Sequence, residues 1–189
     1  AVDDRLENLA PIHYARVYAG RVQIILQPQM SFGTGHHQTT YLMSQYLLDM
    51  ESVPSKVLDM GTGTGVLAIL AEKLGATDIL AIDIEPWSVE NTIENAQRNL
   101  CKYIRTATGD SDLITETDFG LILANINKNI LKRQLPIYHG ALVPNGMLLL
   151  SGFFVTDAAE MIALGQELGF EHVETIEKET WAAVKLIKK

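Results

Sequence analysis

The sequence predicts an α/β protein built on one mostly parallel sheet with helices on both faces. Three observations predict this class. Short apolar segments alternate with longer segments of helical pattern, a glycine-rich turn joins the first such strand to a helix, and the last two apolar segments are separated only by a short charged turn. Strands that are separated by helices run parallel, whereas two strands joined by a short turn run antiparallel. The closing hairpin must therefore add an antiparallel strand to the sheet.

The first half of the chain is expected to alternate helices and strands. Val53-Pro54-Ser55 ends an opening helix, Gly75 ends the helix after the glycine-rich turn, and Pro86 fits the first turn of the next helix. The expected elements are a helix over 39–49, a strand over 56–60, a helix over 66–74, a strand over 79–83 and a helix over 86–99. In the last of these helices, apolar residues recur at steps of four, three and four and so line one face: Val89, Ile93, Ala96 and Leu100.

The second half continues the pattern and ends in a hairpin. Pro144-Asn145-Gly146 makes a turn into a strand, and Gly169 ends the last helix. The expected elements are strands over 104–107 and 119–125, a helix over 126–138, a strand over 147–151, a helix over 156–168, and strands over 170–176 and 181–187. The charged turn Glu177-Lys178-Glu179 joins the final two strands.

Length and composition restrict the class of protein. A chain of 189 residues holds one substantial α/β domain and a short extra segment. The net charge of −8 argues against a basic nucleic-acid-binding surface, so no direct nucleic-acid partner is expected. The lone Cys101 excludes an internal disulfide and a cysteine metal cluster. No run approaches the roughly 18 apolar residues of a membrane span, and no signal peptide is recognisable, so we expect no membrane association and a cytoplasmic location.

The segment VLDMGTGTG at 57–65 is the most informative part of the chain. Val57 and Leu58 favour a strand, and the apolar run that follows the glycines favours a helix, so the glycines lie in a strand-to-helix turn. Glycine allows the backbone to turn tightly and to lie against a ligand. Asp83 ends the next strand, 22 positions after Gly61, where its carboxylate can accept hydrogen bonds from both hydroxyls of a ribose. These features predict a nucleoside-cofactor site.

The identity of the cofactor is less definite, because a glycine turn followed by an acid also describes NAD-binding domains. Two details favour S-adenosylmethionine. Asp59 precedes the first glycine, and the glycines are spaced as G-x-G-x-G rather than G-x-G-x-x-G. A nearby carboxylate suits a positively charged methionine end better than it suits a pyrophosphate.

Two further polar residues follow expected strands. Asp110 would face the adenine edge, although a solvated turn residue is an equally good interpretation of Gly109-Asp110. Asn125 ends a buried strand, and its amide needs partners there. It could orient an attacking amine through neutral hydrogen bonds, or it could simply cap the next helix. In open α/β sheets, ligands bind beyond the carboxyl ends of the strands, which favours the functional interpretation.

The segment at 30–40 combines small residues, hydroxyls and an aromatic residue, and it suggests a loop folded over a ligand. Adjacent His36 and His37 suggest a metal, but no second cluster has ligand spacing, so no metal site is expected. The sequence contains neither a G-x-S-x-G elbow nor a P-loop, and it gives no support to a serine hydrolase or a nucleoside triphosphatase.

Four segments together resemble the bacterial ribosomal protein L11 methyltransferases. They are FGTGHHQTT at 32–40, DMGTGTG at 59–65, DIEP at 83–86 and ANI at 124–126, and the spacing between them also fits. The resemblance runs from about Val22 to the C-terminus. The first segment is specific to the family, whereas the glycine turn marks only the wider class. Two stretches depart from the family pattern: His36-His37-Gln38, where Thr-His-Pro is usual, and Asn127-Lys128-Asn129, where apolar and small residues are commoner.

The resemblance implies a Rossmann-like class I methyltransferase with a seven-stranded, mostly parallel sheet, an antiparallel C-terminal strand and S-adenosylmethionine as methyl donor. By matched position, Thr40, Gly61, Asp83 and Asn125 would bind the cofactor, Gly63 would line it, and Phe32 with the loop to Gly35 would cover its methionine end. Asp110 completes the candidate site from the residue-based argument above.

The resemblance also implies a partner and a domain organisation. Family members methylate lysine side chains and the N-terminal amine of one ribosomal protein, so a basic ribosomal protein is the expected substrate. Members carry an N-terminal domain that captures this protein. We therefore expect residues 1–27 to be an N-terminal segment or linker remnant, and residues 28–189 to be the methyltransferase domain.

The expected chemistry needs no strong base. A sulfonium methyl group is already activated, so the protein mainly positions the attacking nitrogen and excludes water. Asn125 is the candidate catalytic residue. Two alternatives remain at this point: a small-molecule methyltransferase on the same fold, and a non-catalytic module that binds S-adenosylmethionine or a dinucleotide.

Overall fold

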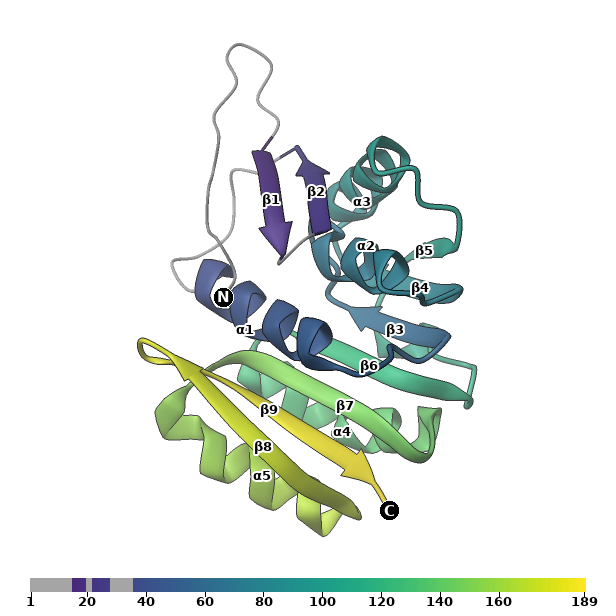
Figure 1. Ribbon diagram of the computed structural model, residues 1–189. Coiled ribbons are helices and arrows are strands. Elements are labelled where there is room, and N and C mark those ends of the chain that lie inside the picture. Colours follow the sequence, from purple (N-terminus) through teal and green to yellow (C-terminus); the bar gives the residue numbers. More distant parts are fainter. Residues whose placement is uncertain (1–14, 20–21, 28–35) are drawn as a thin grey trace.

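The computed structural model describes residues 15–19, 22–27 and 36–189. Within them, seven strands form one sheet in the order β5-β4-β3-β6-β7-β9-β8, shown in Figure 1. The first five are parallel, and β9 is antiparallel to both of its neighbours. The strands are β3 (Lys56–Met60), β4 (Asp78–Asp83), β5 (Ile104–Thr108), β6 (Phe119–Asn125), β7 (Leu142–Phe154), β8 (Phe170–Lys178) and β9 (Trp181–Lys188). The predicted fold class, including the antiparallel C-terminal strand, is confirmed.

A separate two-stranded hairpin precedes the sheet and consists of β1 (Ala15–Ala19) and β2 (Val22–Leu26). The helices are α1 (His36–Asp49), α2 (Val66–Lys73), α3 (Pro86–Arg98), α4 (Lys128–Ala141) and α5 (Ala158–Glu167), with single turns η1 (Ser111–Leu113) and η2 (Val155–Asp157). Ile24 of β2 is fully buried in the core that α1 and α2 share. The predicted boundary between residues 27 and 28 stays a prediction.

Helices cover both faces of the sheet because successive strand residues point in opposite directions. Val57 belongs to the core beneath α1 and α2, whereas its neighbour Leu58 belongs to the core beneath α4 and α5. The same alternation occurs at Ile79 and Leu80 on β4. The central strands are therefore apolar throughout, as the sequence pattern predicts.

The strand order reverses at β3. The chain passes from β3 to β4 and β5 on one side, and then returns to place β6 on the other side of β3. In open α/β sheets, ligands bind outside the carboxyl ends of the strands at such a switch point. The end of β3 is Met60, directly before the glycine turn, and the end of β6 is Asn125. The fold thus places the glycine turn and Asn125 at the carboxyl ends of two neighbouring strands.

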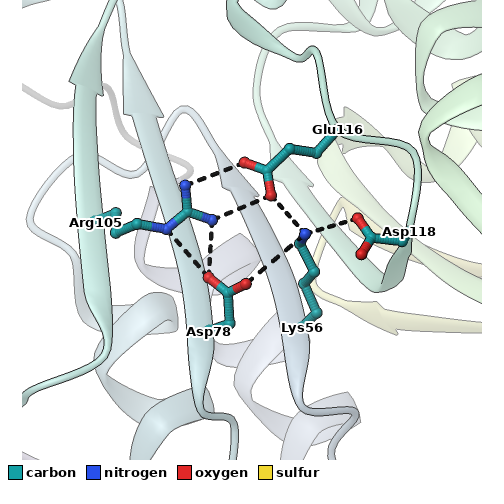
Figure 2. Close-up of polar contacts among 5 residues, drawn as sticks. All are labelled: Lys56, Asp78, Arg105, Glu116 and Asp118. Atoms are coloured by element: carbon teal, nitrogen blue, oxygen red, sulfur yellow. Dashed lines mark hydrogen bonds and ion pairs between the residues drawn. The ribbon is translucent and has the colours of Figure 1, made fainter.

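An ion-pair network closes the opposite, amino-terminal edge of the same strands, shown in Figure 2. Lys56 pairs with Glu116 and Asp118, and Arg105 pairs with Asp78 and Glu116. These pairs raise the pKa of Lys56 and lower that of Glu116. The network ties the starts of three neighbouring strands to the segment before β6, at the edge of the sheet remote from the glycine turn.

Several sequence expectations need correction at their boundaries. Helix α1 begins at His36 rather than at 39, so residues 36–40 of the expected loop over 30–40 are helical. Strand β8 continues to Lys178, so two residues of the expected turn 177–179 belong to the strand. Helix α4 begins at Lys128 rather than at 126, because Asn127 caps it by accepting a hydrogen bond from the Asn129 amide at 2.8 Å. Strand β7 runs from 142 to 154, and Pro144-Asn145-Gly146 lies in an irregular part of its register with β6. Helix α5 begins at Ala158, because residues 155–157 form the 3₁₀ turn η2.

The predicted apolar face of α3 is buried only in part. Val89 and Ala96 are buried, but Ile93 is 40% and Leu100 is 83% exposed. The buried face of the helix is instead largely polar and includes Asn91, Thr92 and Asn95. The reason lies in the contacts that this face makes with the glycine turn.

No helix among the described residues is both long and apolar enough to span a membrane. Cys101 is a free thiol.

Candidate functional site

The glycine turn folds back over the end of β4. The amides of Gly61 and Thr62 both donate to the Ile82 carbonyl, at 2.8 and 3.0 Å. Gly61 and Gly63 have φ angles of +74° and +58°, a region that residues with a Cβ rarely adopt. A Cβ on Gly61 would lie 2.1 Å from Cγ2 of Ile126. Glycine is thus required at Gly61 by both its backbone conformation and its neighbour.

Asp83 is joined to this turn. One carboxylate oxygen accepts from the Gly63 amide at 2.9 Å, and the other accepts from the Glu85 amide at 3.0 Å. The residue is 9% exposed. Because a carboxylate oxygen has two lone pairs, each oxygen keeps the capacity to accept one more hydrogen bond. The two backbone bonds therefore fix the orientation of the carboxylate and leave each oxygen able to accept one more hydrogen bond.

Asp59 lies beneath the turn and is 1% exposed. Its carboxylate accepts from the Thr62 hydroxyl at 2.7 Å. Burial raises the pKa of Asp59 to about 7, the Thr62 hydrogen bond opposes this, and the charge of Asp83 adds to it. A cation bound next to the turn would stabilise the charged form of Asp59.

Thr40 and Asn125 lie next to each other at the carboxyl end of β6. Thr40 lies in the second turn of α1 and Asn125 at the end of β6, and the Asn125 amide nitrogen lies 3.5 Å from the Thr40 hydroxyl. Both residues are half-buried. Since Asn127 caps α4, the alternative interpretation of Asn125 as a helix cap is wrong. The functional interpretation of Asn125 remains a prediction.

Asp110 caps the turn η1, where it accepts from the Ser111 amide at 2.7 Å. The same oxygen accepts from the side chain of Gln134 at 2.6 Å, and buried Gln134 accepts from the Tyr138 hydroxyl. Asp110 itself is exposed. These bonds give it a structural role in the turn, and its predicted contact with adenine remains open.

The structure therefore places five of the seven predicted site residues in two connected groups, and Asp110 follows a residue that is hydrogen-bonded to the first group. Gly61, Gly63 and Asp83 belong to one hydrogen-bonded unit. Gly109, which precedes Asp110 in the chain, is connected to this unit because its amide donates to the Asp83 carbonyl at 2.9 Å. Thr40 and Asn125 form the second group. Ile126 connects the two, because it follows Asn125 in the chain and packs against Gly61.

Phe32 lies outside the described residues, as do the side chains of His36 and His37. Across the part of the chain that the structure describes, no three His, Cys, Asp or Glu side chains gather in a group that could hold a metal ion.

Sequence reasoning missed the residues of α3 that hold the turn in place. The Thr92 hydroxyl donates to the Gly63 carbonyl at 3.0 Å, and the Asn95 amide donates to the Thr64 carbonyl at 2.8 Å. A signal was present in the sequence: asparagines occur at 91, 95 and 99, one helical turn apart. Asparagine is unfavourable inside a helix, so three on one face indicate specific partners.

Fold and site together define a class of protein. A doubly wound sheet with an antiparallel C-terminal strand, a glycine turn at the switch point and an acid at the end of the next strand form the Rossmann-like domain of S-adenosylmethionine-dependent methyltransferases.

Comparison with known proteins specifies the family. Residues 9–189 match the family model described as ribosomal protein L11 methyltransferase (PrmA), and the chain belongs to this family. It is 47% identical to the ribosomal protein L11 methyltransferase of Porphyromonas gingivalis, over 87% of this chain and 57% of that protein. The chain thus spans less than two thirds of the length of this curated relative.

Two solved structures are similar as well. The crystal structure of a ribosomal protein L11 methylase from Lactobacillus delbrueckii subsp. bulgaricus has 31% sequence identity and a TM-score of 0.79, covering 87% of this chain and 84% of that one. The structure of M. jannaschii TYW2 in complex with AdoMet has a TM-score of 0.67 at 12% identity, covering 92% and 84% of the two chains, which shows the shared fold.

Proposed function

We propose that this protein transfers methyl groups from S-adenosylmethionine to amines of a ribosomal protein, in the cytoplasm where ribosomal proteins are made. The observation that carries the proposal is the match of residues 9–189 to the family model. The site supports it, because the glycine turn and Asp83 offer the backbone approach and the acceptor pair that a nucleoside needs. A net charge of −8 also suits a basic protein partner.

Each residue of the site has a proposed role. Asp83 accepts hydrogen bonds from the ribose, Gly61 and Gly63 allow the cofactor to lie against the backbone, and Thr40 with Asn125 binds it at the carboxyl end of β6. Phe32 covers the methionine end, and Asp110 lies toward the adenine. When bound, S-adenosylmethionine supplies a methyl group that the sulfonium centre has already activated.

The protein's task is then to position the acceptor. A free lysine amine has a pKa near 10.4 and must be neutral to attack, so the site must not stabilise the ammonium ion. The Asn125 amide is uncharged and can hold an amine by hydrogen bonds without favouring its protonation. An in-line approach held in this way contributes to the rate through orientation.

The test is single-turnover methyl transfer to isolated ribosomal proteins with labelled cofactor, followed by mass spectrometry. We expect labelled lysines or a labelled N-terminal amine on one ribosomal protein. Asn125→Ala should lower the rate by roughly 100-fold through lost orientation. Asn125→Asp should lower it further at neutral pH, since a carboxylate favours the protonated amine.

Asn127→Ala is the matched control, because it removes an asparagine two positions away that caps α4. Its rate should remain near that of the parent once folding is confirmed. Label on small amines with none on any ribosomal protein would support a small-molecule methyltransferase instead. A parental rate for Asn125→Asp would remove Asn125 from the mechanism.

A further inference from the structure

The buried polar face of α3 connects two parts of the molecule that are distant in sequence. On one side it contacts the glycine turn, and on the other it contacts β2 of the N-terminal hairpin. Thr92 and Asn95 are both fully buried. A buried amide or hydroxyl is unfavourable unless it is hydrogen-bonded, so the partners of these side chains explain why an apolar residue does not occupy either position.

Asn95 uses both ends of its amide. Its nitrogen donates to the Thr64 carbonyl at 2.8 Å and to the Asn91 side chain at 3.2 Å. Its oxygen accepts from the Gln27 amide at 2.8 Å and from the Arg98 guanidinium at 2.9 Å. One side chain therefore fixes the backbone of the glycine turn and the backbone at the end of β2.

Thr92 holds the neighbouring residue of the turn. Its hydroxyl donates to the Gly63 carbonyl at 3.0 Å, while the Gly63 amide donates to Asp83. The Thr92 methyl group also lies 2.8 Å from the position of a Cβ on Gly65. Helix α3 thus fixes the peptide of Gly63 through this hydrogen bond and packs against Gly65.

Asn99 offers an internal comparison, because it anchors the same strand. Its side chain donates to the Ile25 carbonyl at 2.7 Å and accepts from the Ile25 amide at 2.9 Å. It donates also to the backbone carbonyl of Asn95 at 2.7 Å. Among the described residues, the Asn99 side chain forms no hydrogen bond with the glycine turn.

We propose that Asn95 is a positioning residue for the cofactor turn, which it holds in a binding-competent shape through Thr64 while tying it to β2 through Gln27. The identity of the ligand rests on the proposed function. The positioning itself does not, because it concerns the shape of the turn in the ligand-free protein. Binding free energy that is spent on ordering a mobile turn is lost from affinity, so a preformed turn binds more tightly.

The test compares Asn95→Ala with Asn99→Ala in two measurements. Calorimetry with S-adenosylhomocysteine should show at least a tenfold higher Kd for Asn95→Ala and a change within twofold for Asn99→Ala. Hydrogen exchange in the ligand-free protein should show faster exchange of the Gly63 amide in Asn95→Ala only. The second readout separates this inference from the proposed function, since it needs no ligand.

Conservative variants test the same hydrogen bonds in case Asn95→Ala fails to fold. Asn95→Asp keeps an acceptor for the Gln27 amide but loses the donor to Thr64, so it should share the weakened binding. Thr92→Val should also weaken binding, and Thr92→Ser, which keeps the hydroxyl, should restore most of it. If Asn95→Ala and Asn99→Ala lose equal stability and both keep the parental Kd and Gly63 exchange rate, Asn95 has only a structural role and the inference is wrong.

Discussion

Asp83 is the residue that we propose to bind the ribose of the cofactor, and its two oxygens are already oriented by the amides of Gly63 and Glu85. Asp83→Ala should weaken binding of S-adenosylmethionine by about 1.5–3 kcal/mol, the range for hydrogen bonds to a charged group. Isothermal calorimetry measures this, with circular dichroism to confirm folding. Asp110→Ala should lose less affinity. Equal affinity of Asp83→Ala and the parent would remove Asp83 from the site.

The raised pKa of Asp59 predicts that the stability of the protein depends on pH. Its pKa is about 7 in the folded protein and near 3.9 in an unfolded chain. Between these values the folded state binds more protons, so this residue's contribution to stability falls as the pH rises from about 4 to about 7 and is level above that.

Asp59→Asn removes this dependence. The unfolding free energy of the variant, minus that of the parent, should therefore increase between pH 5 and pH 8, by roughly 2–3 kcal/mol if each unit of pKa difference contributes about 1.4 kcal/mol. Urea unfolding at the two pH values measures the difference. A difference that does not change with pH would show that Asp59 titrates normally.

At the scale of elements, the glycine turn and the start of the segment after β6 are packed against each other. Gly61→Ala should be destabilising for two reasons: its φ is +74°, and its new Cβ would meet the Ile126 side chain. Ile126→Ala removes this clash, because the Cβ of residue 126 would lie 3.7 Å from the new Cβ at position 61, an ordinary contact distance.

A double-mutant cycle by urea unfolding separates the two contributions. Gly61→Ala should be destabilising by more than about 2 kcal/mol in the parent, and by only the conformational contribution of about 1–2 kcal/mol in the Ile126→Ala background. Strict additivity of the two substitutions would contradict the packing described for this turn.

The elements also show where sequence reasoning works and where it stops. Strands β3, β4 and β6 follow directly from their apolar runs, because both faces of a central parallel strand are buried. The predicted start of α4 is wrong because both Asn125 and Asn127 could cap the helix. Only contacts with the rest of the protein decide between them. The predicted buried face of α3 is wrong because the spacing of apolar residues does not reveal which face of a helix is buried when polar residues have buried hydrogen-bond partners.

Across the whole molecule, the amino ends and the carboxyl ends of the parallel strands differ in the residues that they carry. The amino-terminal edge is closed by the charged network of Figure 2, which joins β3, β4 and β5 at their starts. The carboxyl edge carries the glycine turn, Asp83 and Asn125. Motifs at the carboxyl edge were predictable because they depend on local sequence, whereas the α3 contacts join residues up to 74 positions apart.

We propose that S-adenosylmethionine binds at the carboxyl ends of the parallel strands. Thermal unfolding with S-adenosylmethionine, S-adenosylhomocysteine and NAD, each at equal concentration, tests this most directly. At about 100 times Kd, a ligand that binds only the folded state contributes about 2.7 kcal/mol, which corresponds to a rise in Tm of roughly 5–10 °C for a domain of this size. We predict this rise with both S-adenosyl compounds and no shift with NAD. A rise in Tm with NAD and none with S-adenosylmethionine would show that the site binds a dinucleotide and that the methyltransferase proposal is wrong.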